Sequence, residues 1–312
     1  MKIHFNIDDL PVIKNAVITI GTFDGVHEGH KKIIQQIITE ARKINGESVI
    51  ISFHPHPRKV VSSSILGIRL INTIDERIEL LKAQGIDHLV IIPFTDLFAN
   101  QQPEDYLKNF LIKNFHPSVI IIGYDHKFGK DRKGDFQLLE KYQSIYNYEL
   151  QEIPKHILHD TSISSTNIRN AILKSDFETA NQLLGYHFFF EGEVIHGDKI
   201  GRTIGYPTAN LQIKNEEKII PGDGVYAVYV EQANQYPLKK NYKGMMSIGF
   251  RPTVNGKKRV VEVNIFDFTE EIYGQMLRVH VKTYLRPELK FDSLEALTQQ
   301  IDQDKIDSLA VL

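Results

Sequence analysis

The chain has 312 residues, and 37 lysines and arginines nearly balance 39 aspartates and glutamates, which gives a formal net charge of −2. A hydrophobic content of 42% is enough to bury most of the unfolded surface, and this excludes disorder as a description of the whole chain. The length is too great for one ordinary core, so we expect two domains, and the balanced charge disfavours a nucleic-acid partner. Cysteine is absent, which excludes disulfides, thiolate metal sites and cysteine nucleophiles.

The beginning of the chain carries an acidic pair, Asp8 and Asp9, where a secretory signal peptide would carry an apolar stretch. No apolar run approaches the ~18 residues that a membrane span requires. We therefore expect a cytoplasmic protein with no membrane partner. Two short basic clusters, at residues 239–240 and 257–259, are interpreted as solvated loops.

From residue 16 to about residue 184, short apolar runs alternate with amphipathic stretches. The runs at 17–20, 49–53, 89–92 and 119–122 predict strands buried on both faces, which is typical of a parallel sheet. Between them, an apolar stripe from Ile33 to Ile44 repeats at helical spacing, and Thr73 with Glu76 forms a capping box. This alternation predicts a doubly wound α/β domain over residues 1–184.

After Gly185, glycines punctuate segments of alternating polarity, which predicts antiparallel strands of a small barrel or sandwich. The predicted strands cover residues 188–195, 225–230, 242–248, 260–266 and 277–284. Residues 185–312 are expected to form this second domain.

A final helix closes the chain. The pair Asp292 and Glu295 has the spacing of an N-terminal cap. Four apolar residues of the helix, Leu294, Leu297, Ile301 and Leu309, are expected to dock it on the barrel.

The first predicted strand runs directly into the segment GTFDGVHEGH, residues 21–30, and then into a helix. A helix N-terminus presents unpaired N–H groups and a partial positive charge, which together hold phosphate oxygens. Gly25 and Gly29 allow the backbone to approach a phosphate closely, and His27 and His30 can face the same oxygens. Two imidazoles at this point suit a phosphorus centre that accumulates negative charge.

Other interpretations of the histidines are weaker. The segment 21–30 is not a Walker loop, and its HEGH string lacks the spacing of the zinc motif H-E-x-x-H. The plain alternative is a strand-to-helix turn that happens to hold two histidines. Its place at the carboxyl end of a strand, where open α/β sheets bind ligands, favours the phosphate site. Elsewhere, His54 and His56 can be read as metal ligands, but the interleaved prolines favour a structural or substrate-lining role.

A second polar segment lies near the end of the first half. Ser164, Ser165 and Thr166 precede a predicted helix and can cap it, while Arg169 can direct a guanidinium at a triphosphate. The same pattern is typical of an ordinary capped helix with a solvated arginine. The presence of the 21–30 turn in the same domain favours the triphosphate-binding interpretation.

The densest polar stretch of the second half covers residues 197–211. Its glycines, together with Lys199 and Arg202, can wrap a polyphosphate, and the hydroxyl of Thr208 and the amide oxygen of Asn210 are hard donors suited to Mg²⁺. A turn-rich hairpin between barrel strands is the plain alternative. Further along, Glu262 lies between apolar neighbours on a predicted strand, so it alternates to one face and can reach the mouth of the barrel.

The string 27–30, H-x-G-H after a first strand, resembles the signature of the nucleotidyltransferase superfamily. The longer string 21–30 resembles the FMN adenylyltransferase module of prokaryotic bifunctional riboflavin kinases/FAD synthetases, and the segments 52–57, 123–129 and 163–169 agree with it. The resemblance implies that His27, His30 and Arg169 are catalytic. It implies ATP contacts at Gly21, Phe23, Asp24, Gly29, Ser164, Ser165, Thr166 and Arg169, and a flavin contact in a flap segment at Asp125. In that flap, His126-Lys127 departs from the aromatic–basic pair that is frequent in the family.

The second half resembles riboflavin kinases, whose hallmark G-x-P-T-A-N-L stands here at residues 205–211 after G-x-x-x-G-R at 197–202. The segments 221–228, 249–253, 261–266 and 285–291 agree in the same order. The resemblance implies ATP contacts at Gly197, Lys199, Gly201, Arg202, Gly205, Thr208 and Asn210, with Mg²⁺ on Thr208 and Asn210. It also implies that Glu262 is the base on the flavin's ribityl hydroxyl. Ser247 and Asn264 stand where the family often has asparagine and histidine.

Together these resemblances cover nearly the whole chain and imply two ATP-dependent reactions. The barrel would phosphorylate riboflavin to FMN, and the α/β domain would adenylylate FMN to FAD and release pyrophosphate. Riboflavin, FMN and ATP are the expected partners, with Mg²⁺ or another divalent ion as cofactor, and the sequence leaves the oligomeric state open.

Two alternatives remain. The first is a nucleotidyltransferase of related specificity, against which the kinase-like second half argues. The second is a non-catalytic flavin-binding or RNA-regulating protein on the same fold. The presence of His27, His30, Thr208, Asn210 and Glu262 argues against that alternative.

Overall fold

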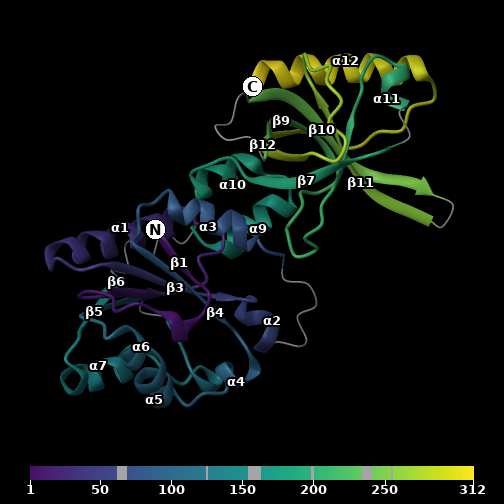
Figure 1. Cartoon of the computed structure of the whole chain (residues 1–312). Helices are drawn as coiled ribbons and strands as arrows, with labels where there is room; N and C mark the ends of the chain where they lie inside the picture. The colour runs from purple at the N-terminus through teal and green to yellow at the C-terminus, as the bar shows by residue number, and fades with distance from the viewer. Residues whose placement is uncertain (62–68, 124–125, 154–162, 198–199, 234–240, 254–255) are drawn as a thin grey trace. The chain divides into compact units, whose positions relative to one another are not determined.

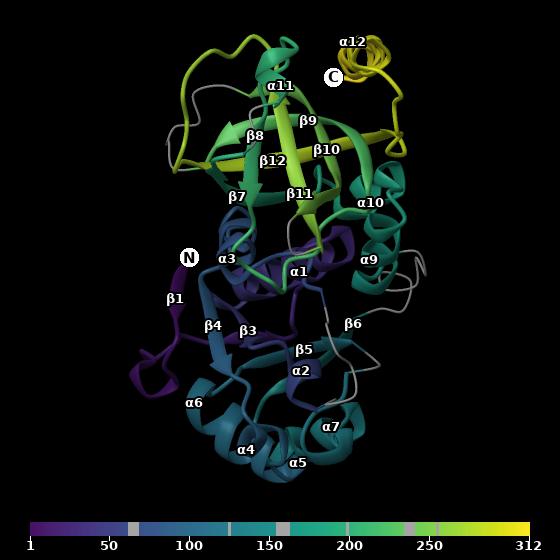
Figure 2. The ribbon, with the colours of Figure 1, turned by 90° about the vertical axis from the view of Figure 1, so that its right-hand side faces the viewer.

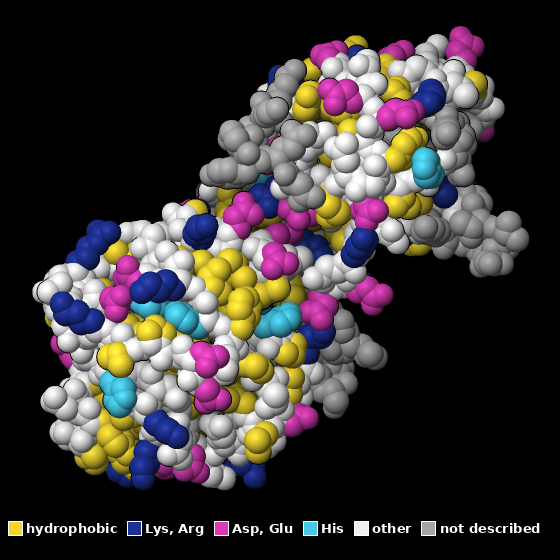
Figure 3. Space-filling view, viewed as in Figure 1, with side chains coloured by type: hydrophobic (Ala, Val, Ile, Leu, Met, Phe, Trp, Pro, Cys, Tyr) yellow, Lys and Arg dark blue, Asp and Glu magenta, His cyan; other side chains and the backbone are white. Residues whose placement is uncertain are grey.

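The structure is a computed structural model, and it describes residues 1–312 except 62–68, 124–125, 154–162, 198–199, 234–240 and 254–255. Contacts between Cα atoms divide the chain into two compact units, Met1–Ser165 and Thr166–Leu312. The first unit holds a six-stranded sheet, and the second holds a closed barrel. On the face drawn in Figure 3, positive and negative side chains are interspersed, in keeping with the net charge of −2.

The first unit contains a parallel sheet flanked by helices (Figure 1). Its strand order is β1-β4-β3-β2-β5-β6. Its strands are β1 (Lys2–His4), β2 (Val17–Ile20), β3 (Ser48–His54), β4 (His88–Pro93), β5 (Val119–Gly123) and β6 (Glu149–Ile153). The four predicted strands and the doubly wound α/β arrangement are confirmed. The edge strands β1 and β6 were not predicted, because they are short, mostly polar and partly exposed.

Helices cover both faces of this sheet. On one face, α1 (Glu28–Lys43) and α3 (Ile74–Lys82) bury Ile34, Ile37 and Leu81 against the strands. On the other face, η2 (Tyr106–Ile112) and α7 (Phe136–Tyr146) bury Phe110 and Leu139. The shorter elements are η1 (Ile7–Asp9), α2 (Pro57–Val61), α4 (Asp96–Ala99), α5 (Pro103–Asp105), α6 (Lys113–Phe115) and η3 (Lys130–Arg132).

The predicted capping box begins α3. The hydroxyl of Thr73 accepts the backbone N–H of Glu76 over 3.2 Å, and the carboxylate of Glu76 accepts the N–H of Thr73 over 3.0 Å. Both contacts satisfy N–H groups at the helix start.

The strand order reverses beside β2. β3 and β4 follow on one side of β2, whereas β5 and β6 lie on the other side. In open α/β sheets, ligands bind outside the carboxyl end of the strand at which the order reverses. Residues 21–30 come directly after β2, so the topology brings the predicted phosphate turn to this position.

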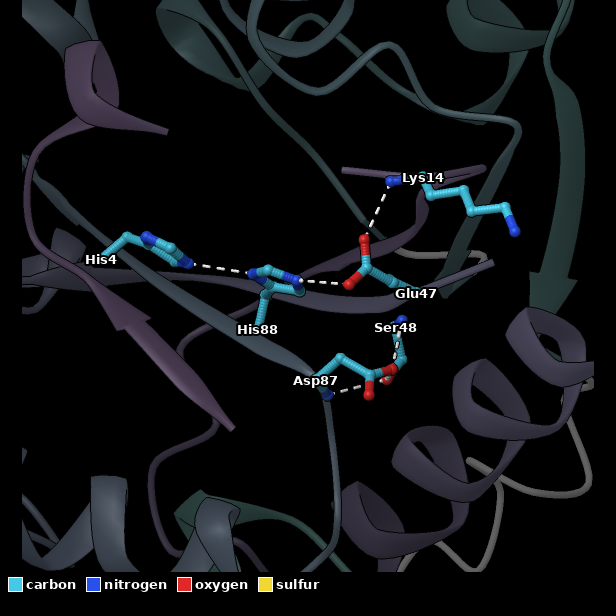
Figure 4. A network of polar contacts seen from close by, with 6 residues as sticks. All are labelled: His4, Lys14, Glu47, Ser48, Asp87 and His88. Atoms are coloured by element: carbon cyan, nitrogen blue, oxygen red, sulfur yellow. Dashed lines mark hydrogen bonds and ion pairs between the residues drawn. The ribbon is translucent and has the colours of Figure 1, made fainter. Parts of the chain in front are cut away.

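A polar network lies at the opposite end of the strands, near the starts of β3 and β4 (Figure 4). Nε2 of His4 lies 2.9 Å from Nδ1 of His88, and Nε2 of His88 lies 3.3 Å from a carboxylate oxygen of Glu47. The carboxylate of Asp87 accepts the hydroxyl of Ser48 over 2.6 Å. The network joins β1 to β4 and stands apart from the carboxyl ends of β2, β3 and β4.

The second unit is a six-stranded antiparallel barrel, closed in the order β10-β11-β8-β7-β12-β9 (Figure 2). Its strands are β7 (Phe189–Ile195), β8 (Ala209–Gln212), β9 (Gly224–Gln232), β10 (Tyr242–Thr253), β11 (Gly256–Ile265) and β12 (Met276–Arg286). Its helices are α9 (Ser165–Leu173), α10 (Phe177–Leu184), α11 (Ile200–Thr203) and α12 (Leu294–Val311). The predicted barrel is confirmed, and β8 was not predicted because it is short and lies in the polar glycine-marked stretch.

The cap of the terminal helix α12 differs from the prediction. Ser293 is the N-cap, and its hydroxyl accepts the backbone N–H of Ala296 over 3.1 Å. The expected pair of Asp292 and Glu295 is therefore wrong by one position. A serine side chain accepts a free N–H group of the first helical turn in the same way as an aspartate does.

The docking of α12 also differs in part. Leu294 and Leu309 are 60% and 44% exposed, so they do not fix the helix on the barrel as expected. Instead, Asp304 of α12 is buried and accepts two hydrogen bonds from Arg286 of β12, over 2.7 and 2.6 Å. The spacing of apolar residues along the chain does not reveal a buried ion pair, so this contact could not be predicted from it.

Candidate active sites

The first candidate site is the turn between β2 and α1. Its backbone enters the left-handed region at Phe23, Gly25 and Val26, where φ is 49°, 94° and 37°. His27 is the N-cap of α1, and its Nδ1 accepts the backbone N–H of His30 over 3.3 Å. The two imidazole rings stack, with centroids 3.6 Å apart. The structure therefore brings both predicted histidines together at the N-terminus of a 16-residue helix.

Two predicted glycines of this turn make room for rings. A Cβ on Gly29 would lie 3.2 Å from Nδ1 of His27, and a Cβ on Gly21 would lie 3.0 Å from the ring of Phe23. The ring of Phe23 in turn lies 4.9 Å from that of His30, centroid to centroid. The glycines thus allow the rings to pack over the helix start.

The electrostatics of the turn favour a neutral His30. Burial lowers the pKa of His30 well below its usual value of 6.5, and the positive charges of His27 and Arg77 lower it further. Its Nδ1 is buried and has no hydrogen-bond partner in the described part of the chain. An anion brought to this point would favour protonation and would give the ring a second donor.

Sequence reasoning missed Arg77, which lies on α3 behind the turn and is 1% exposed. Its Nη1 donates to the carbonyl of Thr22 over 2.7 Å and to the hydroxyl of Ser52 over 3.2 Å. Burial lowers the pKa of Arg77 from its usual value, whereas the negative charge of Asp24 acts in the opposite direction. The only feature of the sequence that could have pointed to Arg77 is its place directly after Glu76, the capping glutamate of a predicted helix.

Asp24 and the late serine segment also meet at the turn. The carboxylate of Asp24 is fully buried and accepts the backbone N–H groups of Ile71 and Asn72 over 3.2 and 3.0 Å. The hydroxyl of Ser165 donates to the backbone carbonyl of Asp24 over 2.8 Å. The structure thus brings the segment around Ser164 and Ser165 to the turn, and the ATP contacts of these residues stay predictions.

The roles of the other residues predicted for this site stay predictions. Thr166 and Arg169 lie on α9 in the second compact unit, and Asp125 lies outside the described residues. Nδ1 of His56 accepts the backbone N–H of Arg58 over 3.2 Å. His56 is buried, and its structural or substrate-lining role stays a prediction.

The second candidate site is a cavity of about 600 Å³ in the barrel unit. Apolar side chains line part of it, among them Ile204, Met245, Leu289, Leu297 and Ile301. Polar side chains line the rest, among them Thr208, Arg251, Glu262, Asn264 and Glu288. A volume of this size with few polar groups is typical of a small-molecule site.

The barrel strands bring two of the predicted kinase residues onto one face. Glu262 of β11 is the direct cross-strand partner of Asn210 on β8. Directly opposed residues of an antiparallel pair point to the same face, so the predicted base and the predicted metal ligand are neighbours. The amide of Asn264 donates to the carbonyl of Pro207 over 2.7 Å, which ties β11 to the residue before Thr208.

The glycines of the 197–211 stretch also have structural reasons. A Cβ on Gly197 would overlap the side-chain amide of Asn210, and a Cβ on Gly201 would overlap the carbonyl of Tyr206. Gly205 has a φ of 82°, in the left-handed region. Arg202 is exposed, and its Nη2 lies 3.8 Å from Oε1 of Glu271.

Lys199 lies outside the described residues. Its predicted contact with ATP, like that of Arg202, stays a prediction.

Comparison with known proteins decides the family. Residues 10–167 match the family model described as FAD synthetase, and residues 184–312 match the model described as riboflavin kinase. The bifunctional riboflavin kinase/FMN adenylyltransferase of Listeria monocytogenes is 37% identical over 297 residues, which are 95% of this chain and 92% of that protein. The chain belongs to this bifunctional family.

Further members of the bifunctional riboflavin kinase/FMN adenylyltransferase family are similar along most of their length. The protein of Escherichia coli is 34% identical and covers 94% of this chain, with 91% of its own length matched. The protein of Buchnera aphidicola is 36% identical, with 97% of this chain and 96% of that protein matched. The first candidate site falls in the FAD synthetase part, and the second falls in the riboflavin kinase part.

A solved structure shares the whole fold of this family member. The crystal structure described as a macrolide-efflux protein from Streptococcus pneumoniae matches with a TM-score of 0.85 at 33% identity, over 98% of each chain. Among the described residues of the present chain, no helix combines the length and the apolar character needed to cross a membrane.

Proposed function

We propose that the chain carries out two consecutive reactions on flavins. The barrel unit transfers the γ-phosphoryl group of ATP to riboflavin, and the N-terminal unit joins AMP from a second ATP to the resulting FMN. The observation that carries the proposal is the occurrence, in one chain, of a histidine turn at a sheet switch point and of a barrel cavity holding Glu262. We place the boundary between the two functional domains after residue 184.

In the adenylylation step, a phosphate oxygen of FMN attacks the α-phosphorus of ATP. The new P–O bond forms as the bond to pyrophosphate breaks, so no covalent enzyme intermediate is needed. Negative charge builds up on the α-phosphate oxygens, where the N-terminus of α1, His27 and His30 stabilise it. Arg169 is assigned to the triphosphate, and Asp125 is assigned to the flavin.

In the kinase step, Glu262 accepts the proton of the ribityl hydroxyl, whose oxygen attacks the γ-phosphorus as ADP leaves. A carboxylate within hydrogen-bond reach of the hydroxyl is suited to this role. The apolar part of the cavity fits a flat aromatic ring, and the polar part, with Glu262 and Thr208, fits the ribityl chain and phosphate.

Thr208 and Asn210 fit a magnesium ion. They offer a hydroxyl and an amide oxygen, and Gly197 leaves the space that the Asn210 amide occupies. Mg²⁺ is commonly held by one or two protein oxygens together with substrate phosphates. When bound, it would neutralise charge on the phosphates of ATP.

The test is to incubate the purified protein with riboflavin, ATP and Mg²⁺ and to separate the flavins by chromatography. We expect FMN to appear first and FAD to follow. His30→Ala should lower FAD formation from FMN by about 10²- to 10³-fold and spare riboflavin phosphorylation, and Glu262→Ala should do the reverse. Loss of both activities in one folded variant would contradict the division of labour, and absence of any flavin product would favour a non-catalytic protein.

A further inference from the structure

Arg251 bridges two carboxylates in the barrel cavity. Its Nη2 donates to Oε2 of Glu262 over 2.8 Å, and its Nη1 donates to Oε1 of Glu288 over 2.8 Å. All three side chains line the same cavity. Burial alone would lower the pKa of Arg251, but the hydrogen bond to Glu288 and the charge of Glu262 raise it above its usual value. The guanidinium is therefore a permanent cation beside the proposed base.

Strand β10 explains how the three groups meet. Ser247 is the direct partner of Glu262 across the strands, and Gly249 and Arg251 follow on the same face of β10. A Cβ on Gly249 would overlap the carboxylate of Glu288. The missing side chain thus creates the space in which Glu288 reaches Arg251.

We propose that Arg251 is a positioning residue of the kinase reaction, which holds the carboxylate of Glu262 toward the substrate hydroxyl, and that Glu288 in turn fixes Arg251. The inference rests on the proposed role of Glu262 as the base. A glutamate side chain has several rotatable bonds, so it populates many orientations unless a partner selects one. The planar guanidinium has two donors at a fixed angle, so it can orient one carboxylate while it is held by another.

If these ion pairs served only the stability of the fold, their removal would lower the thermal unfolding midpoint. The side chains of Arg251, Glu262 and Glu288 are 40%, 24% and 31% exposed, and pairs with this much solvent contribute little to stability. Their removal should therefore leave the thermal unfolding midpoint nearly unchanged. An effect that is large on kcat and small on stability indicates positioning.

The experiment is a pair of double-mutant cycles on kcat for riboflavin phosphorylation. Arg251→Gln should lower kcat by about tenfold or more with a much smaller change in the riboflavin KM, because the base loses its orientation. Arg251→Lys should restore part of the loss. In a Glu262→Asp background, which keeps a carboxylate but shortens its reach to Arg251, the effect of Arg251→Gln should largely disappear.

The second cycle tests Glu288. Glu288→Gln should lower kcat by less than Arg251→Gln does, and Gly249→Ala should reproduce this loss by displacing the Glu288 carboxylate. Neither change should lower kcat further in an Arg251→Gln background, because both act through Arg251.

Two controls separate positioning from general damage. FMN adenylylation by the same preparations reports on the intact N-terminal unit and should not change. Arg278→Gln removes another arginine–glutamate pair of the barrel, to Glu191 at 2.7 Å, which does not line the cavity, and should leave kcat unchanged.

Equal losses from Arg251→Gln in the wild-type and Glu262→Asp backgrounds would overturn the inference, and so would an equal loss from Arg278→Gln. Full phosphorylation by Glu262→Ala would instead overturn the proposed base itself. That result differs from one in which Glu262→Ala is inactive and Arg251→Gln is fully active, which overturns only the role of Arg251.

Discussion

The imidazole rings of His27 and His30 stack with their centroids 3.6 Å apart and their planes 16° from parallel. Two positive charges at this distance would repel each other, and the cation of Arg77 adds to the repulsion. Burial is the largest cause of the lowered pKa of His30 and these charges lower it further, so the ring favours its neutral form in the absence of an anion. An anion bound at the turn would relieve this repulsion. Without an anion, protonation of His30 at low pH should lower the stability of the fold.

The stability of the chain should fall as the pH falls below about 6.5. The pKa of His30 is lowered in the folded state, so the unfolded state binds more protons in the window between that lowered value and 6.5. His30→Gln removes this difference and should make the free energy of unfolding less dependent on pH. Urea unfolding at several pH values measures the slope, and equal slopes for the two proteins would contradict the neutral state of His30.

Arg77→Gln should destabilise the N-terminal unit by about 3 kcal/mol, because it removes a buried cation near Asp24 and a donor to the carbonyl of Thr22. FMN adenylylation should also fall, since Thr22 belongs to the phosphate turn. Urea unfolding and the FMN assay measure the two effects. Arg42→Gln, an exposed arginine at the end of α1, is the matched control and should change stability by less than about 0.5 kcal/mol.

Gly197→Ala should raise the Mg²⁺ concentration needed for half-maximal riboflavin phosphorylation by about tenfold. The added methyl group would overlap the amide of Asn210 and turn it away from the proposed ion. The Mg²⁺ dependence of FMN adenylylation in the same protein is the internal reference and should not move. An unchanged Mg²⁺ requirement of the kinase would argue against Asn210 as a ligand.

Asp304→Asn should destabilise the barrel unit by about 3 kcal/mol and raise the KM for riboflavin. The change leaves the guanidinium of Arg286 without its carboxylate at the contact between α12 and β12, and Leu297 of α12 lines the cavity. Asp307→Asn is the control on the same helix, because its carboxylate accepts an exposed hydrogen bond from Gln303. Equal behaviour of the two variants would contradict a role of the buried pair in fixing α12.

The elements that were predicted well from the sequence are those whose signal is local. The apolar runs around Ile18 and Ile121 and the capping box at Thr73 depend only on neighbouring residues, and the structure has them where they were expected. The strands that were missed, β1, β6 and β8, are short and contain polar residues. Such strands exist because a neighbouring strand pairs with them, and their own composition does not require it.

The sequence alone determines the order of the two folds, the phosphate turn and the residue types suited to phosphorus chemistry. These features can be predicted because periodicity, turns and motifs each depend on a few consecutive residues. The folded structure was needed to show that Arg77 supports the turn from 55 residues away and that Arg251 lies between Glu262 and Glu288. Contacts of this kind depend on crossovers and on strand register. A charge that is solvated in one register is paired in another, and the order of residues along the chain does not state which register the barrel adopts.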